Sequence, residues 1–221
     1  YLDWLPLHIS FDENVNPYIT LTVHQVRTDQ EGKTKVWQLD EILLEHPKNT
    51  LRDACAEFRR RYQGHTEGVF VYGDRTSNKQ DVKLEKGQNF FTLALEYLKE
   101  FRPSLRIPSV NPSVKSRGEF INDVFAGRYP NLEILIGANC TTTSGDYMNV
   151  VEDSDGTKHK KKVRDKKTGV SFEKWGHTSD ANDYLHIELF KNDYISYING
   201  NKRLEYRIGK KNNLLTRKNR I

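Results

Sequence analysis

Cysteine, long apolar runs and nucleotide-binding glycine motifs are scarce or missing in this chain of 221 residues, and each absence excludes a class of protein. The two cysteines, Cys55 and Cys140, form no CxxC pair, so the sequence supports neither a disulfide framework nor a zinc site and favours a reducing compartment. No apolar run approaches the roughly 18 residues that a membrane-spanning helix needs, so we expect no membrane association. The GxxxxGK[ST] phosphate loop is also missing, which excludes a P-loop ATPase within the chain.

The amino terminus has neither an initiating methionine nor the charged and then apolar layout of a signal peptide, so we expect a segment of a longer polypeptide. With 36% hydrophobic and 11% aromatic residues the composition is that of a folded protein, and the 29% of charged residues predicts a well-solvated surface. The length suits one sizeable domain, which we expect over residues 1–200, followed by a basic C-terminal tail over residues 201–221.

Charge is divided unevenly along the chain. Residues 158–221 contain 17 Lys or Arg against 7 Asp or Glu, a net of +10, which leaves −5 for residues 1–157 out of the total of +5. An acidic region that collects cations, beside a basic region that holds phosphates, is what a metal-dependent enzyme acting on a polyanion needs. A charge run taken alone is equally typical of a solvated surface.

The first part of the chain is rich in strand signals. Residues 7–11 and 18–26 carry β-branched or alternating apolar side chains around a turn, which predicts a hairpin, and residues 34–44 offer a third strand. Residues 50–64 have helical spacing with Thr50 as the expected cap, and residues 68–72 form a short apolar run typical of a strand buried on both faces.

Strands and helices alternate in the remainder. Helical spacing predicts helices over residues 89–101 and 113–125 and a further helix that holds Asp180. Because β and α units alternate here, the strands between them should be parallel. These short strands are expected at residues 105–110, 132–136 and 147–151.

Three acidic residues stand where this pattern would bring them together. Asp12 ends the first strand, Asp74 follows the buried strand within GVFVYGDRTS, and Asp180 opens the late helix within KWGHTSDANDYL. One fold could gather these distant carboxylates at the edge of a sheet, and oxygen-only ligation suits Mg²⁺ or Mn²⁺. Two such ions can stabilise both the attacking and the leaving oxygen of a phosphodiester.

Each acid also has a structural alternative. Asp12 and Asp74 are common turn residues, and the helix dipole favours an acid such as Asp180 in a first helical turn. Asp183 lies in the same helix turn and is the main rival to Asp180, while Glu13 is a weaker rival to Asp12. The conjunction of three acids in fold order favours the catalytic interpretation.

The order of these elements resembles a known fold. A sheet of three antiparallel strands followed by βα units, with acids on the first strand, the fourth strand and a late helix, resembles the ribonuclease H-like α/β fold, in which helices flank a mixed central sheet. The motifs YGD and GHTSDANDYL are similar to those in the nuclease domain of large terminase subunits, the motor-nucleases that package tailed-phage DNA. The resemblance covers roughly residues 7–190 and rests on order and spacing more than on any one motif.

The resemblance implies a metal-dependent endonuclease that cuts concatemeric double-stranded DNA by a two-metal mechanism with Mg²⁺ or Mn²⁺. It assigns Asp12 to the bridge between the metals and Asp74 and Asp180 to one metal each. It also suggests a metal-proximal role for His177, for which a backbone contact at the helix start is the alternative. The implied partners are an upstream ATPase domain of the same polypeptide, the portal and the small terminase subunit, in the cytoplasm of an infected bacterium with transient docking on the procapsid portal.

A basic run between Gly156 and Gly169 suits a protruding hairpin, and terminase nucleases use a hairpin to approach duplex DNA. Phosphate contacts from it would give affinity with little sequence preference and strong salt dependence, whereas the alternative is a solvated loop. Lys115 and Arg117 could add contacts from the neighbouring helix, and the basic tail could bind DNA, the portal or the capsid. The run supplies the other predicted DNA-binding residues: Lys158, Lys160, Lys161, Lys162, Arg164, Lys166 and Lys167.

Two other functions share this pattern. A Holliday-junction resolvase or another ribonuclease H-like nuclease would use the same metals but would bind branched DNA as a dimer. A DNA-binding or assembly module on the same fold would carry the acids without chemistry. Metal-dependent cleavage of plasmid separates that module from both enzymes, and a junction substrate separates the two enzymes.

Overall fold

The structure of the chain is a computed structural model, and it describes residues 1–14, 16–79, 87–164 and 169–200. The chain divides into two units, Tyr1–Glu188 and Leu189–Ile221. The predicted basic tail lies outside the described residues, so the proposed boundary after residue 200 stays a prediction. No helix in the described ranges is long and apolar enough to span a membrane.

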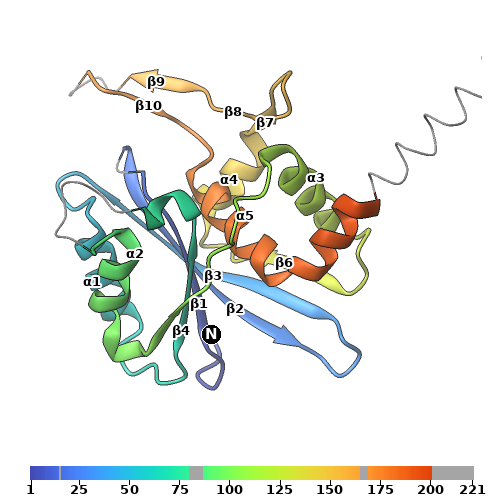
Figure 1. Cartoon of the computed structure of the whole chain (residues 1–221). Helices are drawn as coiled ribbons and strands as arrows, with labels where there is room; N and C mark the ends of the chain where they lie inside the picture. Colours follow the sequence, from blue (N-terminus) through green and yellow to red (C-terminus); the bar gives the residue numbers. More distant parts are fainter. Residues whose placement is uncertain (15, 80–86, 165–168, 201–221) are drawn as a thin grey trace, which may run out of the picture. The chain divides into compact units, whose positions relative to one another are not determined.

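A six-stranded mixed sheet forms the centre of the first unit, with the strand order β5-β4-β1-β2-β3-β6 (Figure 1). β1, β2 and β3 pair antiparallel, whereas β4 pairs parallel to β1, β5 to β4, and β6 to β3. This arrangement confirms the predicted α/β fold with three antiparallel strands followed by parallel ones. The strands are β1 (Leu7–Asp12), β2 (Tyr18–Thr28), β3 (Thr34–Glu45), β4 (Val69–Gly73), β5 (Pro103–Leu105) and β6 (Leu132–Ile136).

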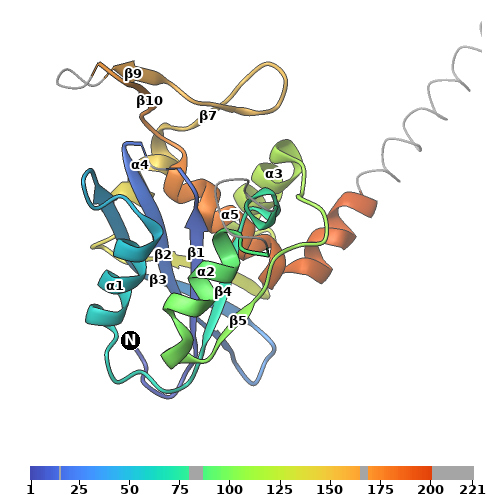
Figure 2. The same cartoon turned by 60° about the vertical axis from the view of Figure 1, so that its left-hand side comes forward.

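Helices cover both faces of this sheet (Figures 1 and 2). α1 and α2 pack against each other on one face, and α3, α4 and α5 lie on the other. Side-chain caps begin the first three helices, with Thr50, Asn89 and Ser113 accepting backbone N–H groups. The helices are α1 (Leu51–Arg61), α2 (Phe90–Tyr97), α3 (Val114–Phe125), α4 (Thr141–Asn149) and α5 (His177–Leu189), with the 3₁₀ turns η1 (Arg75–Asn78) and η2 (Lys99–Phe101).

The alternation of side chains along β1 gives the sheet two different faces. Leu7, Ile9 and Phe11 belong to the apolar core that includes Phe58 of α1 and Phe91 of α2. The residues between them in sequence point to the other face, where the Ser10 hydroxyl donates to the carbonyl oxygen of Ala181 in α5. Asp12 is two residues after Ser10 on the same strand, so its side chain also lies on the α5 side of the sheet.

Two predicted elements are wrong. The strand expected at residues 147–151 is instead the end of helix α4, followed by the two-residue strand β7 (Val151–Glu152). The predicted strand at 105–110 is the earlier and shorter β5, and Pro108 follows it in a segment without strand pairing.

A single basic hairpin was predicted, but the structure has two separate two-stranded ribbons in this region. β7 pairs with β8 (Lys158–His159), and β9 (Lys162–Arg164) pairs with β10 (Ser171–Glu173). Each ribbon is antiparallel and neither belongs to the central sheet (Figure 1).

Candidate metal centre

Asp12 and Asp74 lie side by side because they follow neighbouring parallel strands. Phe11 of β1 is in register with Gly73 of β4, so the next residue on each strand is one of the two acids. Gly73 permits this close approach, since a Cβ there would lie 2.9 Å from both the Phe11 carbonyl oxygen and the Phe91 ring. Close packing thus requires glycine at position 73 of the YGD motif, directly before Asp74.

Asp74 is held by neutral hydrogen-bond donors. Its Oδ1 accepts from the Thr76 backbone N–H at 2.6 Å, from the Thr76 hydroxyl at 2.7 Å and from Asn111 Nδ2 at 2.7 Å. Its Oδ2 accepts from the Tyr184 hydroxyl of α5 at 2.8 Å. Burial alone would raise the pKa of Asp74, but these hydrogen bonds lower it below the usual value, so the carboxylate is ionised and fixed in orientation.

Asp12 is joined to the predicted histidine. His177 Nδ1 lies 3.0 Å from Asp12 Oδ2, and Nε2 lies 2.9 Å from the carbonyl oxygen of Glu173, which can only accept. A proton on both ring nitrogens satisfies the two contacts. Burial lowers the pKa of His177, but the hydrogen bonds to Asp12 and Glu173 outweigh it and the pKa is raised. His177 therefore orients Asp12 in the structure.

Asp180 stands on a helix whose start is capped from elsewhere in the chain. Asp146 of α4 accepts the backbone N–H groups of Thr178 and Ser179 at 2.9 and 3.1 Å. The start of α4 is capped in turn by Glu41 of β3, which accepts the backbone N–H of Thr142 at 2.8 Å. The carboxylates of Glu41 and Asp146 thus accept backbone N–H groups that have no partner within their own helices, and together they set the position of Asp180.

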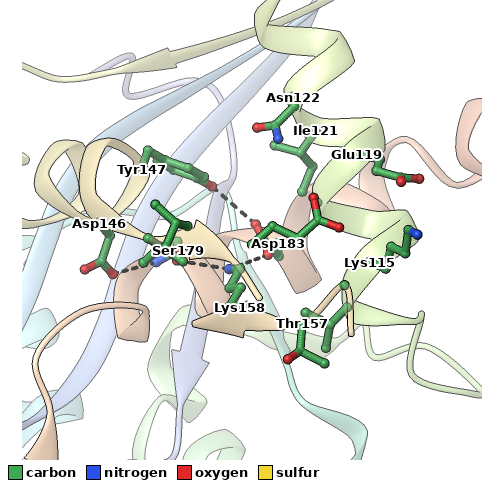
Figure 3. Close-up of a pocket in the computed structure, with 16 residues that line it drawn as sticks. Lys115, Glu119, Ile121, Asn122, Asp146, Tyr147, Thr157, Lys158, Ser179 and Asp183 are labelled. Carbon is green, nitrogen blue, oxygen red and sulfur yellow. Dashed lines mark hydrogen bonds and ion pairs between the residues drawn. The ribbon is translucent and has the colours of Figure 1, made fainter. Parts of the chain in front are cut away.

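Three cations of the chain surround Asp180. Lys158 Nζ lies 2.9 Å from Asp180 Oδ1, Lys160 Nζ lies 2.8 Å from Oδ2, and Arg117 Nη2 of α3 lies 3.0 Å from Oδ1. Burial alone would raise the pKa of Asp180, but the three cations lower it far below its usual range. Lys158 also contacts Asp183 Oδ2 at 2.6 Å (Figure 3).

One pocket is lined by all three predicted acids. Asp12, Asp74 and Asp180 border it together with cations from α3 and from the β8 region. Asp183 is 1% exposed and borders a second pocket, between α3, α4 and the β7–β8 ribbon, that is drawn in Figure 3. The other residues of the first pocket are Asn14, Val114, Arg117, Thr157, Lys158, Lys160 and Tyr184.

The predicted DNA-binding residues are spread over several environments. Arg117 is 3% exposed and pairs with Asp180, so its burial corrects the expectation that it touches DNA from the helix surface. Lys115 borders the second pocket, and Lys158 and Lys160 are held at Asp180. Lys161, which precedes β9, and Lys162 and Arg164 within it are exposed to solvent. Lys166 and Lys167 lie outside the described residues.

Solved structures resemble this fold, although no protein-family model and no curated protein matches the sequence. The large terminase from a thermophilic bacteriophage matches with a TM-score of 0.51 and 14% identity over 84% of this chain and 40% of that chain. The same terminase in complex with ATP-gamma-S gives a TM-score of 0.50 and 14% identity over 82% of this chain and 39% of that one. The chain has the fold of part of a large terminase.

This chain spans about 40% of the length of the terminase that it matches. A further match, to the large terminase nuclease from thermophilic phage G20c with bound magnesium, covers 84% of this chain and 80% of that one at 14% identity, with a TM-score of 0.44. The likeness to the large terminase, at 14% identity, establishes the fold alone.

The three carboxylates have the right chemistry for a metal ion, but in this structure they are not arranged to hold one. The carboxylate oxygens of Asp12, Asp74 and Asp180 are the ligands that Mg²⁺ and Mn²⁺ prefer. Ammonium and guanidinium groups, however, occupy both oxygens of Asp180. Among the residues that the structure describes, no group of three or more His, Cys, Asp or Glu side chains is arranged to hold a metal ion.

Two contributors to the site were not predicted. Tyr184 is one: its hydroxyl donates to Asp74 and its ring lies 4.5 Å from the Arg117 guanidinium. The second is Asp146. No local motif marks it as a helix cap, because the helix that it caps begins 31 residues later. A hydroxyl-bearing side chain in the first turns of the predicted helix that holds Asp180 is the signal that could have identified Tyr184.

Proposed function

We propose that this domain is the nuclease part of a viral DNA-packaging terminase and hydrolyses phosphodiester bonds of double-stranded DNA with the help of Mg²⁺ or Mn²⁺. The observation that carries the proposal is the single pocket lined by Asp12, Asp74 and Asp180. These side chains come from three elements far apart in the sequence, and each is ionised or hydrogen-bonded in a defined orientation. The large-terminase fold supports the same assignment.

Each acid would have a separate role. Asp12 would bridge the metals, and Asp74 and Asp180 would each complete the ligands of one ion. Bound divalent cations would polarise the attacking water and neutralise the leaving 3′ oxygen, and a pair of ions can do both. The surrounding residues prepare the acids for this: Tyr184 orients Asp74, and His177 orients Asp12.

The biological setting belongs to the same proposal. The nuclease would follow an ATPase domain in one polypeptide, cut concatemeric genomes, and work with the portal and the small terminase subunit in the cytoplasm of an infected bacterium. The motifs YGD and GHTSDANDYL and the large-terminase fold support this setting.

Plasmid cleavage tests the proposal. The purified chain is incubated with supercoiled plasmid and Mn²⁺ or Mg²⁺, beside Asp12→Asn, Asp74→Asn and Asp180→Asn variants whose folding is verified by circular dichroism. We expect nicking and linearisation by the wild type, and a loss of at least about 100-fold in each variant because a metal ligand is removed. Asp3→Asn, at an exposed position, serves as the charge-matched control and should cut normally.

Two results would redirect the assignment. A wild-type protein that binds duplex DNA but cuts it with neither metal would contradict the nuclease and favour a binding or assembly module. Preferential cleavage of a four-way junction over linear duplex would favour the resolvase alternative.

A further inference from the structure

The two lysines at Asp180 come from a segment outside the central sheet, where Lys160 also pairs with Glu173 at 3.0 Å and the Lys174 backbone N–H donates to the carbonyl oxygen of Lys161. Lys158 is on β8, whose only strand partner among the described residues is β7, through two residue pairs. Lys160 follows directly after this ribbon. Together β7, β8 and Lys160 form a segment that we call the lysine latch, and Figure 3 shows Lys158 reaching inward between Ser179 and Asp183.

The third cation at Asp180 is held differently. Arg117 lies within helix α3, is 3% exposed, and stacks on Tyr184 at 4.5 Å. It cannot leave Asp180 unless α3 unpacks from the domain. Lys158 and Lys160 belong to a segment outside the central sheet, so no pairing of that sheet has to break for them to leave Asp180.

A lysine ammonium group and a metal ion at the same carboxylate repel each other and compete for its lone pairs. The ammonium nitrogens lie 2.9 Å from Oδ1 and 2.8 Å from Oδ2 of Asp180, and Mg²⁺ would need to approach such an oxygen to about 2.1 Å. Both oxygens already accept from cations, so withdrawal of a lysine frees a lone pair and removes a repelling charge, and both changes favour metal ligation by Asp180.

The charge of the site changes with the latch. Withdrawal of the two lysines removes two positive charges from a pocket that keeps the carboxylates of Asp12, Asp74 and Asp180. A pocket with two fewer positive charges attracts divalent cations more strongly.

We propose that the lysine latch keeps Asp180 closed to metal ions and that the phosphate backbone of double-stranded DNA opens it by drawing Lys158 and Lys160 away. This inference rests on the proposed function, because it assumes that the site takes metal and DNA. Each lysine then has two alternative partners, a carboxylate or a phosphate. DNA binding and metal binding therefore favour one another, and by linkage each raises the affinity for the other.

Metal binding is the direct test. Isothermal titration calorimetry with Mn²⁺ and no DNA is performed on the 221-residue chain and on Lys160→Met, the milder change because the Lys160 side chain is 25% exposed. We expect Mn²⁺ to bind on the order of tenfold more tightly, since one ion pair at Asp180 is removed. Lys160→Arg retains the charge and should remain near the wild type, as should Lys174→Met, at an exposed position outside the latch.

DNA binding should change in the opposite direction. Fluorescence anisotropy with a short labelled duplex, without metal and at fixed salt, should show weaker binding by Lys160→Met, because a phosphate contact is lost. If Lys160 had only a structural role, Lys160→Met would bind both Mn²⁺ and DNA more weakly. Unchanged or weaker Mn²⁺ binding by a folded Lys160→Met would overturn the latch, and Lys158→Met provides a second variant for the same measurement.

The outcomes separate this inference from the proposed function. If Lys160→Met binds Mn²⁺ more tightly but neither protein cuts plasmid, the latch stands and the nuclease proposal fails. If the wild type cuts plasmid in a carboxylate-dependent way while Lys160→Met leaves Mn²⁺ affinity unchanged, the nuclease stands and the latch fails.

Discussion

The two faces of the central sheet are built on opposite principles. The face toward α1 and α2 buries apolar side chains such as Ile9, Phe58 and Phe91. The face toward α5 buries polar ones, and a chain of hydrogen bonds runs across it from β2 through α5 and β3 to α4. Its members are His24, Asn182, Gln38, Thr143 and Glu41.

This difference separates stability from chemistry. The apolar face gains free energy from non-directional burial and tolerates small shifts, whereas the polar face depends on donors and acceptors that must meet at fixed distances. The carboxylates of the candidate metal centre are on or beside the polar face, because hydrogen bonds and ion pairs can orient a charged group there. The polar face is therefore the part that gives the site its geometry.

The largest change should come from breaking the apolar face. Phe58→Ala removes a ring that is fully buried against Phe101 and Tyr62, and we expect the free energy of unfolding to fall by about 3–5 kcal/mol. Urea denaturation followed by circular dichroism measures it. Trp4→Ala, at a 65% exposed side chain, is the control and should change little. A loss below about 1 kcal/mol for Phe58→Ala would contradict the assignment of stability to this face.

Acid should destabilise the polar face selectively. Burial, with a smaller contribution from the Arg106 charge, lowers the pKa of His8 to about 4, and burial lowers that of His186 to about 3. An unfolded histidine takes up a proton near pH 6.5, whereas these folded ones take it up only near their lowered pKa values. Stability is therefore present above pH 6.5 and is lost as the pH falls from 6.5 toward 4, by about 3 kcal/mol for His8.

Urea denaturation at several pH values measures this loss. His8→Gln should flatten the decline between pH 7 and 4, whereas His46→Gln, at an exposed position, should leave the slope as it is. Equal slopes for the wild type and His8→Gln would show that protonation of the polar face does not limit acid stability.

The smallest expected effect lies within the hydrogen-bond chain. Asn182→Leu leaves Gln38 Oε1 and His24 Nε2 without their partner in α5, at a cost of about 1–3 kcal/mol. Adding Gln38→Leu removes one of these stranded groups, so the double variant should lose less than the sum of the two single variants. Urea midpoints of the four proteins give the coupling, and strictly additive losses would mean that the two amides act independently.

The sequence predicted the apolar face well and the polar face poorly. Strand alternation and helical spacing identified β1 to β4, α1 and α3, because each pattern is local. The end of helix α4 was predicted as a strand and its start was not predicted at all, since Thr141 to Ser144 and Gly145 are weak helix formers. Its start is stabilised by Glu41, about 100 residues away in sequence, and no local pattern records such a contact.

The candidate site shows the same division. Asp12, Asp74 and Asp180 were predicted from their positions next to strands and a helix, and the structure has all three in one pocket. The charge state of the pocket was not predictable. The basic run predicted phosphate contacts for Lys158 and Lys160, and only the fold shows that both lysines pair with Asp180.

The caps from Glu41 to α4 and from Asp146 to α5 make the position of Asp180 depend on two relays outside its own helix. Asp12 and Asp74, by contrast, are neighbours through the pairing of β1 with β4. A change at Glu41 or Asp146, neither of which lines the pocket of the three acids, would therefore reach the pocket through Asp180 and leave the other two acids side by side.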